Sequence, residues 1–140
     1  MYKIQKTIAI NATRERVFSA LTNSQEILKY FPLTGVDSTW VVGSQVLYKG
    51  EVEGVPFTDF GVIEEIEKPV VYSYRYWSDN HGTERLHENH LTISYHLSIA
   101  GVGTELTLTQ SNIKSQEMYQ MMNEQVWDYL LAALKTYTES

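Results

Sequence analysis

The sequence predicts an α+β fold in which a curved antiparallel sheet of about six or seven strands wraps around a long C-terminal helix. Residues 115–137 contain no Gly or Pro, and their apolar side chains recur near the 3.6-residue period of a helix with one buried face. Many of the residues before this segment alternate between apolar and polar side chains, as strands do. The helix can bury its apolar stripe only against that sheet, which must curve to cover it.

The N-terminal segment predicts a strand followed by two short helices. Residues 2–10 alternate loosely and are expected to form the strand. Thr13 is the expected N-cap of the first helix. Asn23, with Glu26 three residues later, predicts the start of the second helix as a capping box. Pro32 is expected to end that helix, because proline disfavours helical geometry in the residue before it.

The middle of the chain predicts five further strands, which alternate with turns. Gly, Pro and polar clusters separate the apolar runs, as expected for antiparallel hairpins. The expected strands cover residues 44–49, 57–67, 70–77, 90–98 and 104–110, and the expected turns and loops cover residues 33–43, 50–56, 68–69, 78–88 and 100–103. No repeat or linker interrupts this order, so we expect one domain spanning residues 1–140.

Composition excludes several function classes. The chain has 140 residues and a formal net charge of −6, with its Lys and Arg residues scattered, which argues against nucleic-acid binding. It contains no cysteine, which excludes thiol catalysis and thiolate metal sites. No apolar run approaches the roughly 20 residues that span a bilayer, and no signal peptide is recognisable. We therefore expect a cytoplasmic protein without a membrane span.

The segment VVYSYRYW at residues 70–77 is the strongest candidate for a ligand site. A period of two places Tyr72, Tyr74 and Tyr76 on one face of the strand. Facing the helix, their hydroxyls would surround a cavity and bind the polar end of a ligand. The alternative is an ordinary core in which the hydroxyls bind backbone or water. The predicted cavity residues are Leu28, Phe31, Trp40, Phe60, Tyr72, Tyr74, Tyr76, Ile93, Tyr95, Leu108, Met118, Tyr119, Met122, Asn123 and Val126.

The early turns of the long helix are expected to line the same cavity. Met118, Met121 and Met122 carry flexible side chains that adapt to varied apolar ligands, although methionines also serve as ordinary core residues. Asn123 lies on the inward stripe, where a polar side chain indicates a ligand contact, a wet cavity or the edge of the stripe. The later turns carry Leu and Trp and are expected to close the core.

No catalytic, metal or cofactor site is predicted. His81, His87 and His90 lie in or next to a polar loop without thiolates or an HExxH pattern, so we expect solvated side chains rather than metal ligands. Gly101 and Gly103 lie between two strands and are not followed by the helix that a phosphate site needs. Tyrosine, with an ordinary pKa near 10, is a poor acid or base at neutral pH. The sequence thus favours binding over catalysis.

Several segments in order resemble a known family. They are residues 8–31, the Trp40 to Gly43 turn, EIEKPVVYSYRYWS, GVGTELTLTQSN, and the Trp127 to Lys135 stretch. Together they resemble the single-domain relatives of the activator of heat-shock-protein-90 ATPase, within the START-like (SRPBCC) superfamily. The resemblance implies a helix-grip fold, with a cavity between a bent sheet and the C-terminal helix.

Two function classes follow. The leading hypothesis is binding of a small apolar or amphipathic molecule, aromatic or lipid-like, in that cavity. The resemblance implies the alternative, a co-chaperone-like or stress-response module that binds the 90-kDa heat-shock ATPase. It also implies a third class, since some START-like relatives act on polyketides or other aromatic substrates. An exposed edge strand permits a homodimer as well as a monomer.

Overall fold

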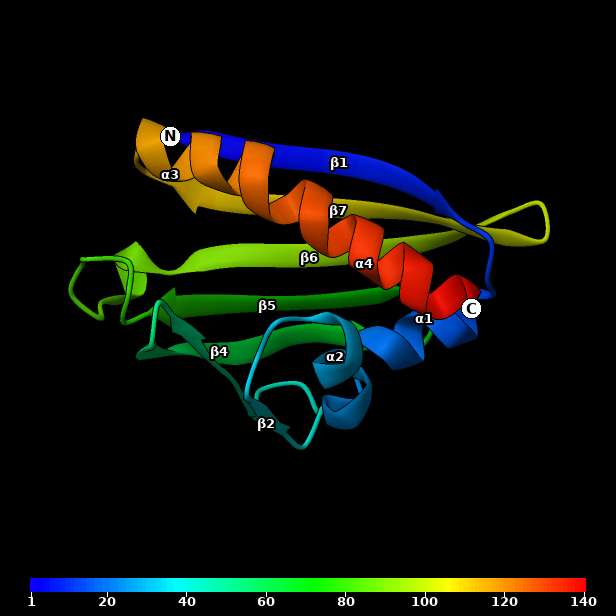
Figure 1. Ribbon diagram of the computed structural model, residues 1–140, viewed down its shortest axis with the longest axis horizontal. Coiled ribbons are helices and arrows are strands. Elements are labelled where there is room, and N and C mark those ends of the chain that lie inside the picture. Colours follow the sequence, from blue (N-terminus) through cyan, green and yellow to red (C-terminus); the bar gives the residue numbers. More distant parts are fainter.

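The computed structural model describes all 140 residues and contains one seven-stranded antiparallel sheet with its helices gathered on one face (Figure 1). The strand order is β1-β7-β6-β5-β4-β3-β2. The elements are β1 (Tyr2–Ile10), α1 (Arg14–Leu21), α2 (Ser24–Tyr30), β2 (Gly35–Ser38), β3 (Gln45–Val52), β4 (Val55–Glu67), β5 (Val71–Ser78), η1 (His87–Asn89), β6 (Leu91–Ala100), β7 (Gly103–Ile113), α3 (Gln116–Met121), η2 (Met122–Val126) and α4 (Trp127–Glu139). This arrangement confirms the predicted helix-grip fold.

Two predicted turns contain more strand than expected. The turn predicted at residues 50–56 is a two-residue connection, because β3 continues to Val52 and β4 begins at Val55. Glu53 and Gly54 adopt φ values of 52° and 80°, the left-handed geometry of a tight hairpin turn. The turn-rich segment 33–43 contains β2, which pairs with β3 along its whole length. A four-residue edge strand depends on its partner, so local composition does not reveal it.

The two short helices begin where the sequence predicts. The Thr13 hydroxyl accepts a hydrogen bond from the Arg16 backbone N–H at 3.2 Å. The Asn23 side chain accepts from the backbone N–H groups of Gln25 (3.0 Å) and Glu26 (3.1 Å). These side chains satisfy donors that a helix leaves unpaired at its first turn.

The predicted capping box is wrong in one respect, because the Glu26 carboxylate bonds to other elements instead of returning to Asn23. It accepts hydrogen bonds from Arg16 Nη1 at 2.5 Å, Ser19 Oγ at 2.5 Å and Tyr137 Oη at 2.9 Å. The Arg16 guanidinium also lies 4.7 Å from the centre of the Tyr137 ring. One carboxylate therefore joins α1, α2 and α4.

The C-terminal helix is continuous from Gln116 to Glu139, with one wider turn at η2. Figure 1 shows it crossing the β1, β7 and β6 side of the sheet and ending beside α1. Trp127 Nε1 donates to Gln110 Oε1 on β7 at 2.7 Å, and Gln110 Nε2 donates to Tyr76 Oη on β5 at 3.1 Å. All three side chains are buried, so this chain of bonds connects the helix to the sheet. No helix has both the length and the apolarity to cross a membrane.

We predict that Glu26→Gln lowers the free energy of unfolding by about 1–2 kcal/mol at pH 7, because it weakens charge-assisted hydrogen bonds. Burial raises the pKa of Glu26, but the bonds from Ser19, Arg16 and Tyr137 outweigh it and hold the pKa below its ordinary value of 4.5. The contribution is therefore present above pH 4.5 and is lost as the pH falls through the folded-state pKa.

Urea unfolding of both proteins between pH 3 and pH 7 measures this difference. Glu15→Gln, on the exposed first turn of α1, is the matched control and should cost less than Glu26→Gln, about 0.5 kcal/mol from the helix dipole. Equal unfolding midpoints for Glu26→Gln and the unaltered protein at pH 7 would contradict the role of Glu26.

Candidate functional site

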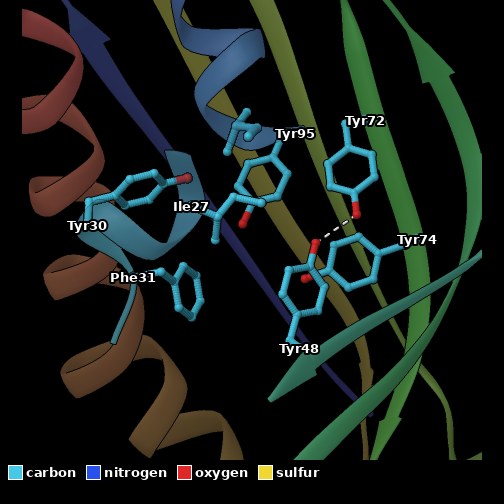
Figure 2. Close-up of a pocket in the computed structure, with 8 residues that line it drawn as sticks. Ile27, Tyr30, Phe31, Tyr48, Tyr72, Tyr74 and Tyr95 are labelled. Carbon is cyan, nitrogen blue, oxygen red and sulfur yellow. Dashed lines mark hydrogen bonds between the residues drawn. The ribbon is translucent and has the colours of Figure 1, made fainter. Parts of the chain in front are cut away.

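A cluster of tyrosines on the sheet faces α2 across a small internal void. Figure 2 shows Tyr30 and Phe31 on the helical side and the tyrosine cluster of Tyr48, Tyr72, Tyr74 and Tyr95 around the other sides. The void has a volume of about 10 Å³ and is lined by Leu21, Ile27, Tyr30, Phe31, Tyr48, Tyr72, Tyr74 and Tyr95. That volume is near the lower limit for one water molecule. The inner face of the sheet is thus almost filled by side chains.

Strand register places the tyrosine cluster. Tyr72 on β5 lies directly opposite Tyr95 on β6, and their rings stack 6.1 Å apart at 4°. Tyr48 reaches over from β3, and its hydroxyl lies 2.7 Å from that of Tyr72. Gly61 of β4 makes this close packing possible, because a Cβ atom there would lie 2.8 Å from Val46 Cγ1. A larger residue at position 61 would displace the side chains that support the cluster.

The hydroxyls of the tyrosine cluster can bind a polar group but cannot act as bases at neutral pH. Burial raises the pKa of each tyrosine of the cluster. Tyr48 and Tyr72 share one hydrogen bond, which leaves one of their two protons free. Tyr74 and Tyr95 both line the void. The arrangement therefore offers neutral donors and acceptors inside an aromatic wall.

The fifteen predicted cavity residues fall into three groups: those that line the void, those that pack in the core without lining it, and those that lie elsewhere. Four of them, Phe31, Tyr72, Tyr74 and Tyr95, line the void. Eight belong to the hydrophobic core or pack against it without lining the void: Trp40, Tyr76, Ile93, Leu108, Met118, Tyr119, Met122 and Val126. Leu28 is 39% exposed, Asn123 is half-buried, and Phe60 lies on the other face of the sheet.

Phe60 and the early turns of the C-terminal helix were predicted to line the cavity, and the structure places them elsewhere. Phe60 lies opposite Trp77, with the Arg85 guanidinium 4.0 Å from its ring centre, so it covers the outer face. Alternation along a strand does not reveal which face is inner. No residue of the C-terminal helix lines the void, because the short helices α1 and α2 occupy that side.

Four lining residues escaped the sequence analysis: Leu21, Ile27, Tyr30 and Tyr48. Ile27 and Tyr30 are three residues apart on α2, which places them on one helix face. Tyr48 shares its strand face with the buried Val46, two residues earlier. Both spacings are visible in the sequence, but neither indicates that the two segments meet.

A second hollow, the α2–α4 groove, opens on the surface beside the void. It has a volume of about 560 Å³ and is lined by Lys29, Tyr30, Tyr129, Ala132, Ala133, Thr136, Tyr137 and Ser140. Tyr30 borders both hollows. Its hydroxyl donates to the Ala20 carbonyl at 2.9 Å, and its ring stacks on Tyr137 at 5.5 Å. One side chain therefore forms part of both walls.

Tyr72, Tyr74 and Tyr76 form a row along β5, and polar side chains lie beyond this tyrosine row, near the C-terminal end of the strand. Asp59 on β4 lies opposite Ser78 on β5 and opposite Tyr48 on β3, so it shares the inner face. The pKa of Asp59 is raised to about 6, chiefly by burial, with hydrogen bonding to Ser78 lowering it and the Asp79 charge raising it. No group of three or more His, Cys, Asp or Glu side chains is placed to hold a metal ion.

His81 differs from the solvated loop histidine expected from the sequence. Its ring packs edge-on against Tyr76 at 5.5 Å, and its buried Nδ1 has no hydrogen-bond partner. Burial lowers the pKa of His81, which favours the neutral ring. The other loop histidines meet the expectation more closely, since His87 is exposed and His90 is half-buried.

Comparison with known proteins identifies the family of this chain. The family described as "Activator of Hsp90 ATPase homolog 1-like protein" matches residues 11–139. The chain belongs to this family. The solution structure of ChR145 from Cytophaga hutchinsonii is 32% identical, with a TM-score of 0.84 over 99% of this chain and 94% of that one. No curated protein sequence matches.

More distant structures share the fold of this family member. The Aha1 dimer from Colwellia psychrerythraea is 20% identical, with a TM-score of 0.79 over 99% of this chain and 97% of that one. CalU16 from Micromonospora echinospora is 19% identical, with a TM-score of 0.75 over 97% of this chain and 75% of that one. At these identities the likeness concerns architecture, so the function has to be argued from the site.

For this member of the Hsp90-activator-like family, we predict that Asp59→Asn increases the free energy of unfolding at pH 7 by about 1–3 kcal/mol. The folded-state pKa of Asp59, about 6, lies above the ordinary value of 3.8. The folded protein therefore binds this proton more tightly, and stability falls as the pH rises from 3.8 through 6.

Denaturant unfolding at pH 3.5 and pH 7.5 measures this effect. The variant and the unaltered protein should have similar stability at the lower pH and differ at the higher one. A variant that is less stable at pH 7.5 would show that the Asp59 carboxylate is compensated within the protein.

Proposed function

We propose that this protein binds a small apolar or amphipathic molecule between α2 and the tyrosine cluster, with access through the α2–α4 groove. The observation that carries the proposal is the position of Tyr30, which borders both the internal void and the surface groove. Rotation of this one side chain would join the two spaces. The groove, of about 560 Å³, is a shallow hollow largely open to solvent and would serve as the entrance rather than as the binding pocket.

Binding in this position would require the pocket to open. A void of about 10 Å³ holds no organic molecule, so a ligand must displace the Tyr30 ring. Displacement breaks the hydrogen bond to the Ala20 carbonyl, which contributes about 1 kcal/mol. Burying about 200 Å² of apolar ligand surface contributes about 5 kcal/mol in the opposite direction. Burial exceeds the loss of that hydrogen bond, and the ligand must also offset the lost stacking of Tyr30 on Tyr137 and the entropy of association.

The tyrosine hydroxyls would orient the ligand rather than react with it. Tyr74 and Tyr95 border the void and can donate to a carbonyl, ether or hydroxyl group. Their raised pKa values keep them protonated near neutral pH. Binding, rather than acid–base chemistry, is the role that these groups suit.

We predict that Tyr30→Ala binds the uncharged fluorophore N-phenyl-1-naphthylamine roughly tenfold more tightly than the unaltered protein, because no side chain has to move first. Fluorescence titration gives both dissociation constants. Tyr30→Leu is the second variant, since it retains apolar packing against Tyr137 if the alanine variant unfolds. A far-ultraviolet circular dichroism melt verifies folding.

Tyr129→Ala provides the matched control. Tyr129 lines the α2–α4 groove but not the internal void, and it is 55% exposed. The Tyr129→Ala variant should bind N-phenyl-1-naphthylamine with an affinity within about twofold of the unaltered protein if the probe lies in the internal site. Weaker binding by Tyr129→Ala, with no gain for Tyr30→Ala or Tyr30→Leu, would place the ligand on the surface and refute the internal site.

A second candidate function rests on family membership, which is shown over residues 11–139. It is a co-chaperone-like interaction with the 90-kDa heat-shock ATPase. Adding the protein to that chaperone should then raise its ATPase rate and yield a complex in a pull-down. An unchanged rate with no complex would eliminate this candidate and leave ligand binding unaffected.

A further inference from the structure

Asp59 places a carboxyl group on the same face of the sheet as the tyrosines. Residues directly opposite in neighbouring strands share a face, and Asp59 pairs with Tyr48 on one side and Ser78 on the other. Tyr76 lies two residues before Ser78, and therefore on the same face of β5. Tyr48 lines the void, and Asp59 is its direct cross-strand neighbour on that face, although Asp59 does not itself line the void.

The protein supplies no cation for this carboxylate. Five ion pairs occur in the structure, and none includes Asp59. The neighbouring charged group, Asp79, is also acidic and raises the pKa of Asp59. Ser78 lowers the pKa of Asp59 but carries no charge, and its hydroxyl also donates to Asn80 Oδ1 at 2.7 Å. Asp59 is half-buried, and a partly desolvated carboxylate without a cationic partner reduces stability, which makes it a candidate for a ligand contact.

The surrounding rings would favour a positive charge as well. The ring centres of Tyr48 and Tyr74 lie 5.4 Å apart, and those of Tyr74 and Tyr76 lie 5.9 Å apart, so the three form one aromatic wall. The faces of such rings attract ammonium groups, most strongly where water is excluded. A carboxylate beside an aromatic wall combines the two interactions that select an organic cation over a neutral molecule.

We propose that the natural ligand carries an amine or quaternary ammonium group that pairs with Asp59 while its apolar part occupies the tyrosine cluster. This inference rests on the proposed ligand-binding function and adds the chemical class of the ligand. It distinguishes this site from a purely apolar pocket, in which a charged group would reduce affinity.

Two probes of the same shape test the inference. Benzyltrimethylammonium and neopentylbenzene differ in one atom, nitrogen or carbon, and therefore in charge. In NMR chemical-shift titrations we expect the unaltered protein to bind the cation about tenfold more tightly than the hydrocarbon. Asp59→Asn should remove this preference and leave the affinity for neopentylbenzene unchanged. Glu67→Gln removes one charge from an exposed position of the same strand and should retain the preference.

The outcomes separate this inference from the proposed function. If neopentylbenzene binds and the cation binds no better, ligand binding stands and the Asp59 inference fails. It fails also if Asp59→Asn retains the preference, or if Glu67→Gln loses it to the same extent, because net charge would then explain the effect. If neither probe binds the unaltered protein or Tyr30→Ala, both proposals are overturned.

Discussion

One buried amide, that of Gln110, links the C-terminal helix to the sheet. It is fully buried, accepts from Trp127 on α4 and donates to Tyr76 on β5. A buried polar side chain must find partners, so the helix cannot slide along the sheet without leaving the amide unpaired. The hydrogen bond from Gln110 Nε2 orients Tyr76, which continues the row formed by Tyr72 and Tyr74. The position of the helix and the orientation of the Tyr76 side chain are therefore coupled.

This constraint explains why the candidate site lies beside α2 rather than beneath the long helix. The helix crosses the β1, β7 and β6 side of the sheet, so the tyrosines of β3 and β5 need another cover (Figure 1). The short helices provide it, and the carboxylate of Glu26 joins them to α4. Tyr30, at the end of α2, borders both the groove and the void.

The sequence analysis predicted correctly the features that are set by side chains within one short segment. It failed for features that are set by pairing or packing between segments distant in the sequence. Thr13 and Asn23 are the N-caps that their side chains predicted. Tyr72 and Tyr74 face inward, as alternation along a strand allows. Phe60 was assigned to the wrong face and β2 was read as a turn, because both depend on pairing with another strand. His81 was expected in solvent, whereas the tertiary fold places its ring against Tyr76.

The sequence by itself determined the order of the helices and of every strand except β2, the apolar face of the C-terminal helix and the aromatic character of β5, because these follow from side-chain periodicity and capping within short segments. Only the tertiary structure decided that α2 closes the tyrosine cluster, that the internal void is about 10 Å³, and that Asp59 lies beside Tyr48. Those features depend on which segments meet and on how completely their side chains fill the space between them, and neither is encoded in a local pattern.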